Sequence, residues 1–229
     1  MNLVKLTDGL VRFFYRYMVA SVQWIVLGWP YLFFALALSY ARSMDEIRSL
    51  VLVALALLPF VLSPAMVAVF RTLATFSEAD ESVPNHIWQR SWRTVRQSYW
   101  MTVKVSAVAA VMLAIVLNAT LYYSHHSVFL MGVHLLLCVL VCVAYLMSLT
   151  FVTLREQTWQ DYLKNGVLMT LSNGIIALLV GGGAAVLLVV SFHTPMFPLV
   201  CLAGPSLVGA WVYHVYVKTL ARAVLTKQR

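Results

Sequence analysis

Six long apolar runs, separated by short polar segments, dominate the pattern of this 229-residue chain. Each run is close to the roughly 20 residues that an α-helix needs to cross a bilayer core about 30 Å thick. Because unpaired backbone groups are costly in lipid, each run is predicted to be helical. The runs lie at about 18–40, 49–71, 103–123, 128–152, 166–192 and 196–217. The predicted fold class is an all-α membrane protein, a single polytopic domain over residues 1–229 with its spans in three hairpins.

Two further segments have the periodicity of amphipathic helices. The first, at about 3–16, places charged residues at spacings of three and four ahead of the first apolar run. The second, at about 86–100, places Trp88 and Trp92 on one helical face and Arg90 and Arg93 on the other. Aromatic rings and arginines suit the headgroup layer of a membrane. Both segments are therefore predicted to be interfacial helices on the cytoplasmic surface.

The composition and the positions of the charges agree with this interpretation. Hydrophobic residues make up 62% of the chain and charged residues 10%, whereas a soluble domain has about 25% charged residues. All but two of the 16 Lys and Arg lie at the termini or around the second-to-third and fourth-to-fifth connections, the exceptions being Arg42 and Arg48. By the positive-inside rule, both termini are predicted to be cytoplasmic in a cell-membrane protein. The net charge of +8 therefore reports topology and does not indicate nucleic acid.

The residues that carry most chemistry avoid the apolar runs. All 8 acidic residues lie outside them, although a proton-coupled carrier usually keeps a carboxylate at depth and a hydrolase usually needs an acid–base pair. His134 and His214 lie within runs, and we expect neutral, hydrogen-bonded bundle residues there, with proton relays as the alternative. Cys138 and Cys142 are one turn apart without a nearby carboxylate, which favours packing. The sequence predicts no catalytic residue, metal or cofactor.

Small residues and prolines interrupt three of the runs. Gly181, Gly182 and Gly183 remove side chains from almost one turn, which would let another helix approach closely, either within the bundle or from a partner. A flexible hinge is the alternative, and the oligomeric state, a homo-oligomer included, stays open. Prolines in two runs predict kinks filled by neighbouring helices, or broken helices that expose carbonyls to a substrate. These prolines are Pro59, Pro64, Pro198 and Pro205.

Three segments resemble the YesL-like family of small bacterial membrane proteins. They are LLPFVLSPAMVAVFRTL (57–73), WQRSWRTVRQSYW (88–100) and LKNGVLMTLSNG (163–174). The chain departs from that family in its acidic connector at 78–81 and in having tryptophan where phenylalanine is common. The resemblance implies a cytoplasmic-membrane protein encoded beside carbohydrate ABC importers, and it supplies no catalytic residue.

These observations favour a non-enzymatic accessory component of carbohydrate ABC import, with membrane lipids and sugar-importer subunits as partners. The predicted docking or lipid-sensing residues are those of the aromatic-basic segment: Trp88, Arg90, Trp92, Arg93, Arg96 and Trp100. A facilitative channel or carrier with a path between the kinked second and sixth runs is the alternative. An intramembrane enzyme is the least favoured class, because the sequence offers no nucleophile with its base.

Overall fold

The computed structural model describes residues 3–78, 86–192, 194 and 197–227, which are helical apart from short turns and contain no strand. This confirms the all-α fold class. In chain order the elements are α1 (Leu3–Tyr40), α2 (Met44–Leu57), the π-helix η1 (Leu58–Leu62), α3 (Ser63–Glu78), α4 (Ile87–Ser124), α5 (Val128–Leu154), α6 (Trp159–Ser172), α7 (Gly174–Phe192) and α8 (Phe197–Lys227).

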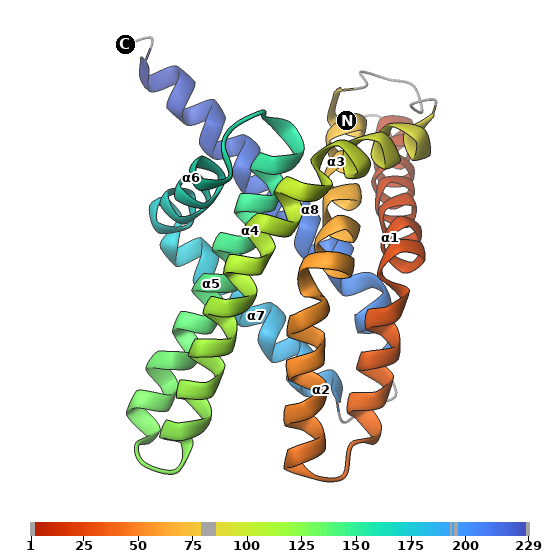
Figure 1. Cartoon of the computed structure of the whole chain (residues 1–229). Coiled ribbons are helices and arrows are strands. Elements are labelled where there is room, and N and C mark those ends of the chain that lie inside the picture. Colours follow the sequence, from red (N-terminus) through yellow and green to blue (C-terminus); the bar gives the residue numbers. More distant parts are fainter. Residues whose placement is uncertain (1–2, 79–85, 193, 195–196, 228–229) are drawn as a thin grey trace.

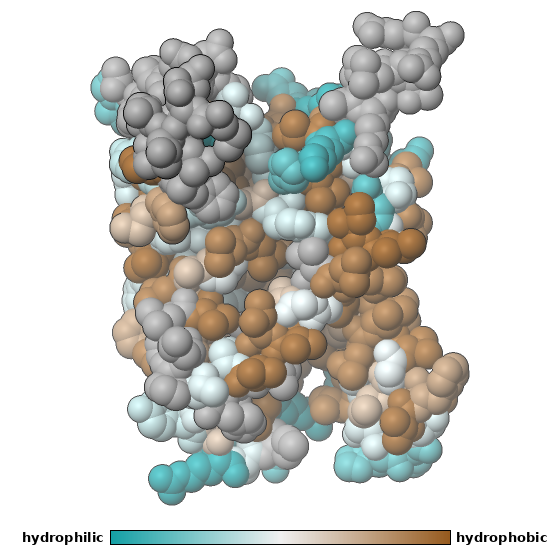
Figure 2. All heavy atoms as spheres, turned by 180° about the vertical axis from the view of Figure 1, so that it is seen from behind, coloured by the Kyte–Doolittle hydropathy of each residue, from teal (hydrophilic) through white to brown (hydrophobic). Residues whose placement is uncertain are grey.

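Within the described part of the chain, five helical stretches are long and apolar enough to cross a membrane: Phe14–Tyr40, Asp45–Ser77, Ile87–Ser124, Val128–Leu154 and Val200–Leu220. The bent pair α6 and α7 supplies a sixth crossing if it is one span. Figure 2 shows hydrophobic residues across the middle of the back of the molecule and hydrophilic residues towards its two ends. The chain is therefore a multi-pass membrane protein.

Two ends of the bundle can be distinguished in Figure 1. The start of α1 and the end of α8 lie at one end, which we call the terminal end. The α1–α2 and α4–α5 turns lie at the opposite end, which we call the turn end. The capping box at Ser43, whose hydroxyl accepts from the Glu46 amide, closes the first of these turns.

The predicted span at 166–192 is not one straight helix. Its first residues belong to α6, which ends at Ser172, and α7 starts at Gly174 with a 90° change of direction. The Asn173 side chain causes the stop: its Nδ2 donates to the carbonyl of Met169 at 2.9 Å and to the Thr219 hydroxyl of α8 at 3.1 Å. An Asn-Gly pair is a common helix terminator.

The two predicted interfacial helices are not separate elements either. Residues 3–16 form the first turns of α1, and residues 87–100 form the first turns of α4, each without a break before the apolar part of the same helix. Helical hydrogen bonding continues through both junctions because neither contains proline or glycine. The aromatic-basic segment is thus rigidly joined to a membrane span.

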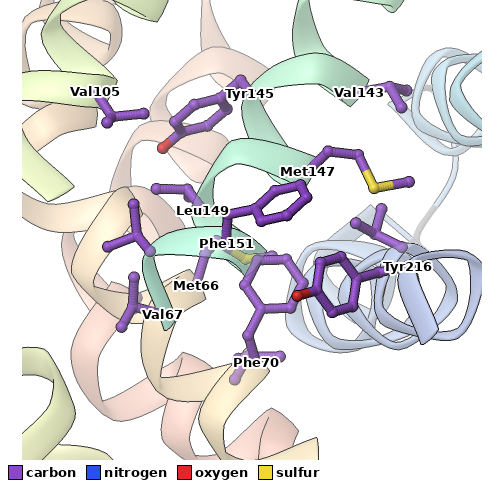
Figure 3. Packing of buried hydrophobic residues seen from close by; sticks show 14 of the residues in the cluster. Met66, Val67, Phe70, Val105, Val143, Tyr145, Met147, Leu149, Phe151 and Tyr216 are labelled. Atoms are coloured by element: carbon purple, nitrogen blue, oxygen red, sulfur yellow. The ribbon is translucent and has the colours of Figure 1, made fainter. Parts of the chain in front are cut away.

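Helix α3 occupies the centre of the bundle, and every residue from Ser63 to Phe70 is buried. It packs against α1, α4, α5 and α8. Figure 3 shows Phe70 of α3 close to Phe151 of α5 and Tyr216 of α8, and the last two rings meet edge to face at 5.0 Å. Because α3 has no exposed face along this stretch, its sequence is apolar or small on all sides.

The π-helix η1 joins α2 to α3 where Pro59 and Pro64 interrupt the backbone ladder, and both prolines are buried. The Leu58 amide bonds three residues back, to the Leu55 carbonyl, so the Ala54 carbonyl accepts instead from the Tyr31 hydroxyl of α1. The Leu58 carbonyl accepts from the Ser63 amide, five residues further on, and also from the Ser63 hydroxyl at 2.7 Å. The Ala54 carbonyl is therefore the one that a side chain of a neighbouring helix fills.

The other two prolines lie in α8, where Pro205 is inside the helix and Pro198 follows its first residue. Proline at the first turn of a helix costs no hydrogen bond, because that amide has no helical acceptor. The two prolines of this run therefore differ in structural effect, and Pro205 alone removes a bond from the helix interior.

Close helix contacts occur at two glycines. A Cβ atom on Gly181 of α7 would lie 2.5 Å from Val139 Cγ1 of α5, whereas Gly182 and Gly183 face open space. The tightest contact, however, is at Gly166 of α6, where a Cβ atom would overlap the Ser148 hydroxyl of α5 and would lie 2.7 Å from the Ala144 carbonyl oxygen of the same helix. Sequence reasoning missed Gly166, because one glycine in an apolar run has no pattern of its own.

We expect Gly166→Ala to destabilise the protein by about 1–3 kcal/mol, because backbone atoms of α5 cannot move away from the added methyl group. Gly182→Ala is the matched control, since open space surrounds it, and it should leave stability unchanged or slightly raised. Thermal unfolding in mild detergent measures both. Equal melting temperatures for the two variants would show that α5 and α6 do not pack this closely.

Candidate partner and lipid interface

The aromatic-basic segment at the start of α4 lies across the terminal ends of α1 and α3 (Figure 1). A buried hydrogen-bond cluster fixes it there. Gln23 of α1 accepts through Oε1 from the Thr72 hydroxyl of α3 and donates through Nε2 to the Ser91 hydroxyl of α4 at 3.4 Å. The Thr72 and Ser91 hydroxyls are themselves 3.1 Å apart. Three helices thus share one polar contact with no exposed member.

The buried side of the segment is formed by Ile87, Ser91 and Val95, each less than a tenth exposed. Trp88 and Trp92, predicted to meet the headgroup layer of a membrane, are 47% and 59% exposed and lie outside this buried side. Ser91 pairs with Gln23, so a serine and not a tryptophan turns towards α1 and α3. Helical periodicity treats a serine as polar and cannot anticipate a buried partner for it.

The structure divides the six predicted docking residues into two groups. Arg90 and Arg93 are exposed on the side of α4 away from the buried face, and we call this pair the arginine face. Trp92, Arg96 and Trp100 instead line a groove between α4, α1 and η1. Trp88 borders the buried face and belongs neither to the arginine face nor to the groove. One helix therefore presents a basic surface and an aromatic one.

Beside the arginine face lies a polar cleft of about 410 Å³ between α4 and the α5–α6 turn. Gln97 and Thr94 of α4 line one wall, and Arg155 and Glu156 line the other. The α5–α6 turn is well ordered because the hydroxyl of Tyr162 donates to the Arg155 carbonyl and accepts from the Gln157 amide, both at 2.8 Å. The polar cleft thus has two fixed walls.

Neither the Tyr162 contacts nor the cap that follows the turn were predicted from the sequence. The Thr158 hydroxyl accepts from the Asp161 amide and donates to its carboxylate at 2.6 Å, which starts α6. The signal was available in the Thr-x-x-Asp spacing before an apolar run, which is typical of a helix N-terminus.

The groove on the other side, which we call the aromatic groove, has a volume of about 650 Å³. Besides Trp92, Arg96 and Trp100 it is lined by Trp29 of α1 and Phe60 of η1. The bend at η1 helps to form it, because Phe60 there points outward and is 53% exposed. Arg96 is the single charged side chain among its lining residues.

A third cavity, the turn-end cleft, has a volume of about 750 Å³ and lies between the outer halves of α2 and α4. In Figure 1 the α1–α2 and α4–α5 hairpins diverge towards this end. Asp45, Arg48, Asn118 and His125 give the cleft polar groups, although its lining is mainly aliphatic. The opening favours access from the turn end, which is relevant to the carrier alternative.

The two histidines within the spans differ in environment. His134 is partly buried, its Nδ1 lies 2.8 Å from the Leu130 carbonyl, and its ring stacks on Tyr123 of α4. His214 was expected in the bundle interior as well, but it is exposed on α8. Its neighbours Tyr213 and Val215 turn towards the core instead. Among the described residues, no group of three metal-ligating side chains gathers anywhere.

Comparison with protein-family models, with curated proteins and with solved structures gave no match.

We expect Gln23→Leu to loosen the start of α4, because Thr72 and Ser91 lose the amide that joins them to α1. Hydrogen bonds inside membrane proteins are worth about 1 kcal/mol, so amide hydrogen exchange over residues 87–95 should accelerate by roughly fivefold. Val22→Leu is the control, since Val22 is 45% exposed next to Gln23. Unchanged exchange over these residues in Gln23→Leu would mean that apolar packing alone fixes the segment.

Proposed function

We propose that this protein is a non-enzymatic component of the cell membrane that docks a cytoplasmic partner on the arginine face of α4. The observation behind this proposal is that Arg90 and Arg93 stand exposed on a helix whose opposite side is held by a buried hydrogen-bond cluster. A surface that is already rigid loses little entropy when a partner binds. No described carboxylate forms an ion pair with either arginine.

The polar cleft extends the docking surface towards the α5–α6 turn. Its walls supply amide, hydroxyl and charged groups at the terminal end of the bundle. With both termini in the cytoplasm, as the distribution of Lys and Arg predicts, this surface faces the cytoplasm. A partner with an acidic, amide-containing helix or loop would match the arginine face and the cleft in charge and polarity.

The partner class we propose is a subunit of a carbohydrate ABC importer, on the basis of the resemblance to the YesL-like family. The chain contains no phosphate-binding Gly-Lys-Ser loop. Its stretch nearest to the ATPase-docking loop of importer permeases, residues 161–166, lacks the Ala pair and the spacing of that loop. An accessory role beside such a permease is consistent with both features.

The test is purification of the tagged protein from its own membranes in mild detergent, with the co-purifying proteins identified by mass spectrometry. Importer permease or ATPase subunits should co-purify with the wild type, and Arg90→Glu/Arg93→Glu should lower their recovery at least about tenfold, because two cations become anions at the contact. The matched control is Lys164→Glu/Lys218→Glu, which makes the same charge change at exposed positions of α6 and α8 and should leave the recovery unchanged. Undiminished recovery with the arginine variant would overturn docking on this face.

A facilitative carrier is the second candidate, and the turn-end cleft is the observation that favours it. A carrier predicts saturable solute flux in liposomes, and Asn118→Phe should reduce that flux several-fold by filling the cleft at a polar lining position. Val111→Phe, on an exposed position of the same helix, is the control. Liposomes that stay sealed to a panel of sugars would exclude the carrier for that substrate class.

A further inference from the structure

We infer that the aromatic groove is a binding site for one anionic phospholipid of the leaflet at the terminal end. The inference rests on the groove alone and does not depend on the proposed partner docking. In outline, the phosphate would contact Arg96, and an acyl chain would run past Trp29 and Phe60.

The depth of the groove points to an amphipathic occupant. Arg96 lies nine residues after the start of α4, within the aromatic-basic segment at the terminal end. Trp29 lies near the middle of the apolar stretch Phe14–Tyr40 of α1, about 20 Å along the helix from Phe14. The groove therefore runs from the level of the lipid headgroups towards the centre of the bilayer. A soluble ligand would match one end and a hydrocarbon the other, whereas a phospholipid matches both.

The charge of the site selects the headgroup. Among the described residues that line the groove, Arg96 is the single charged one, and no described carboxylate pairs with it. An arginine can hold a phosphate through two parallel N–H donors, and the interaction is stronger at the low-dielectric edge of a membrane than in water. Trp92, Tyr99 and Trp100 add polar groups around it. A zwitterionic lipid brings its own cation to the same place, so a net negative lipid is favoured.

The walls of the groove suit an acyl chain. Trp29, Phe60, Trp92 and Trp100 are each more than half exposed, although they are large and apolar or aromatic. In a membrane, these rings would contact lipid and not water, and their edges form a slot of about 650 Å³ rather than a flat surface. Binding cavities for small amphipathic molecules are commonly about 300–1,000 Å³. Phe60 and Val61 of the π-helix η1 and Pro64 of α3 line the slot on this side.

The structure also separates this site from the arginine face. Arg93 is three residues from Arg96, and both side chains are exposed, but Arg93 does not line the groove. If lipid were attracted only by the overall positive charge, Arg93 and Arg96 would contribute equally to binding. A lipid bound in the groove would instead depend on Arg96. This difference provides a matched pair of variants.

The experiment is native mass spectrometry of the full-length protein in mild detergent, titrated with dioleoyl phosphatidylglycerol or dioleoyl phosphatidylcholine. We expect the wild type to retain one phosphatidylglycerol with an apparent Kd about tenfold lower than for phosphatidylcholine, as for one charge-assisted contact. Arg96→Gln should abolish this preference, and Arg93→Gln should keep it. Equal affinity for the two lipids in the wild type, or equal losses in the two variants, would overturn the assignment.

A second pair of variants tests the acyl-chain part. Val61→Phe places a ring inside the groove and should weaken retention of phosphatidylglycerol by about tenfold, because a filled cavity cannot accept the chain. Val53→Phe, on an exposed position of α2, should leave retention unchanged. Glycerol 1-phosphate added in excess should not displace the lipid. Displacement by it, or full retention in Val61→Phe, would show that the groove does not hold the acyl chain.

Discussion

The burial of α3 on all sides is the constraint on which the rest of the structure depends. Ser63 to Phe70 have no exposed face, so four other helices must surround them, and the polar atoms among them must find partners inside the bundle. Ser63 pairs with the Tyr145 hydroxyl of α5, and Thr72, also buried on α3 two residues after Phe70, donates to Gln23 of α1. In a membrane, where alternative arrangements of these helices would be equally apolar, these hydrogen bonds also favour one arrangement over the others.

The same constraint explains why irregular backbone occurs next to α3. The π-helical turn, which contains Pro59 and is followed by Pro64, would leave the Ala54 carbonyl unpaired in lipid, but Tyr31 of α1 supplies a hydroxyl donor. The resulting bend turns Phe60 outward and opens the aromatic groove beside it. The core thus supplies a hydrogen-bond donor where the helix departs from α-helical geometry, and the same departure shapes a surface site.

Both candidate surfaces on α4 depend on that core as well. The start of α4 would be a mobile interfacial segment if it were held by lipid alone, but Ser91 fixes its rotation against α1 and α3. With the rotation fixed, the arginine face points away from the bundle while Arg96 turns to the groove. A protein partner and a lipid can therefore bind the same helix without competing for the same side chains.

The sequence by itself determined the fold class and most of the crossings, because apolar runs of membrane length leave the backbone no alternative to helix. It also located the aromatic-basic segment and the two prolines, Pro59 and Pro64, at which the second run departs from α-helical geometry. Only the tertiary structure decided which side of that segment is buried, where the fifth run bends, and which glycine another helix approaches. The reason is physical: Ser91, Asn173 and Gly166 act through partners on other helices, Gln23, Thr219 and Ala144 respectively. Such partners are distant in the sequence, and no local periodicity contains them.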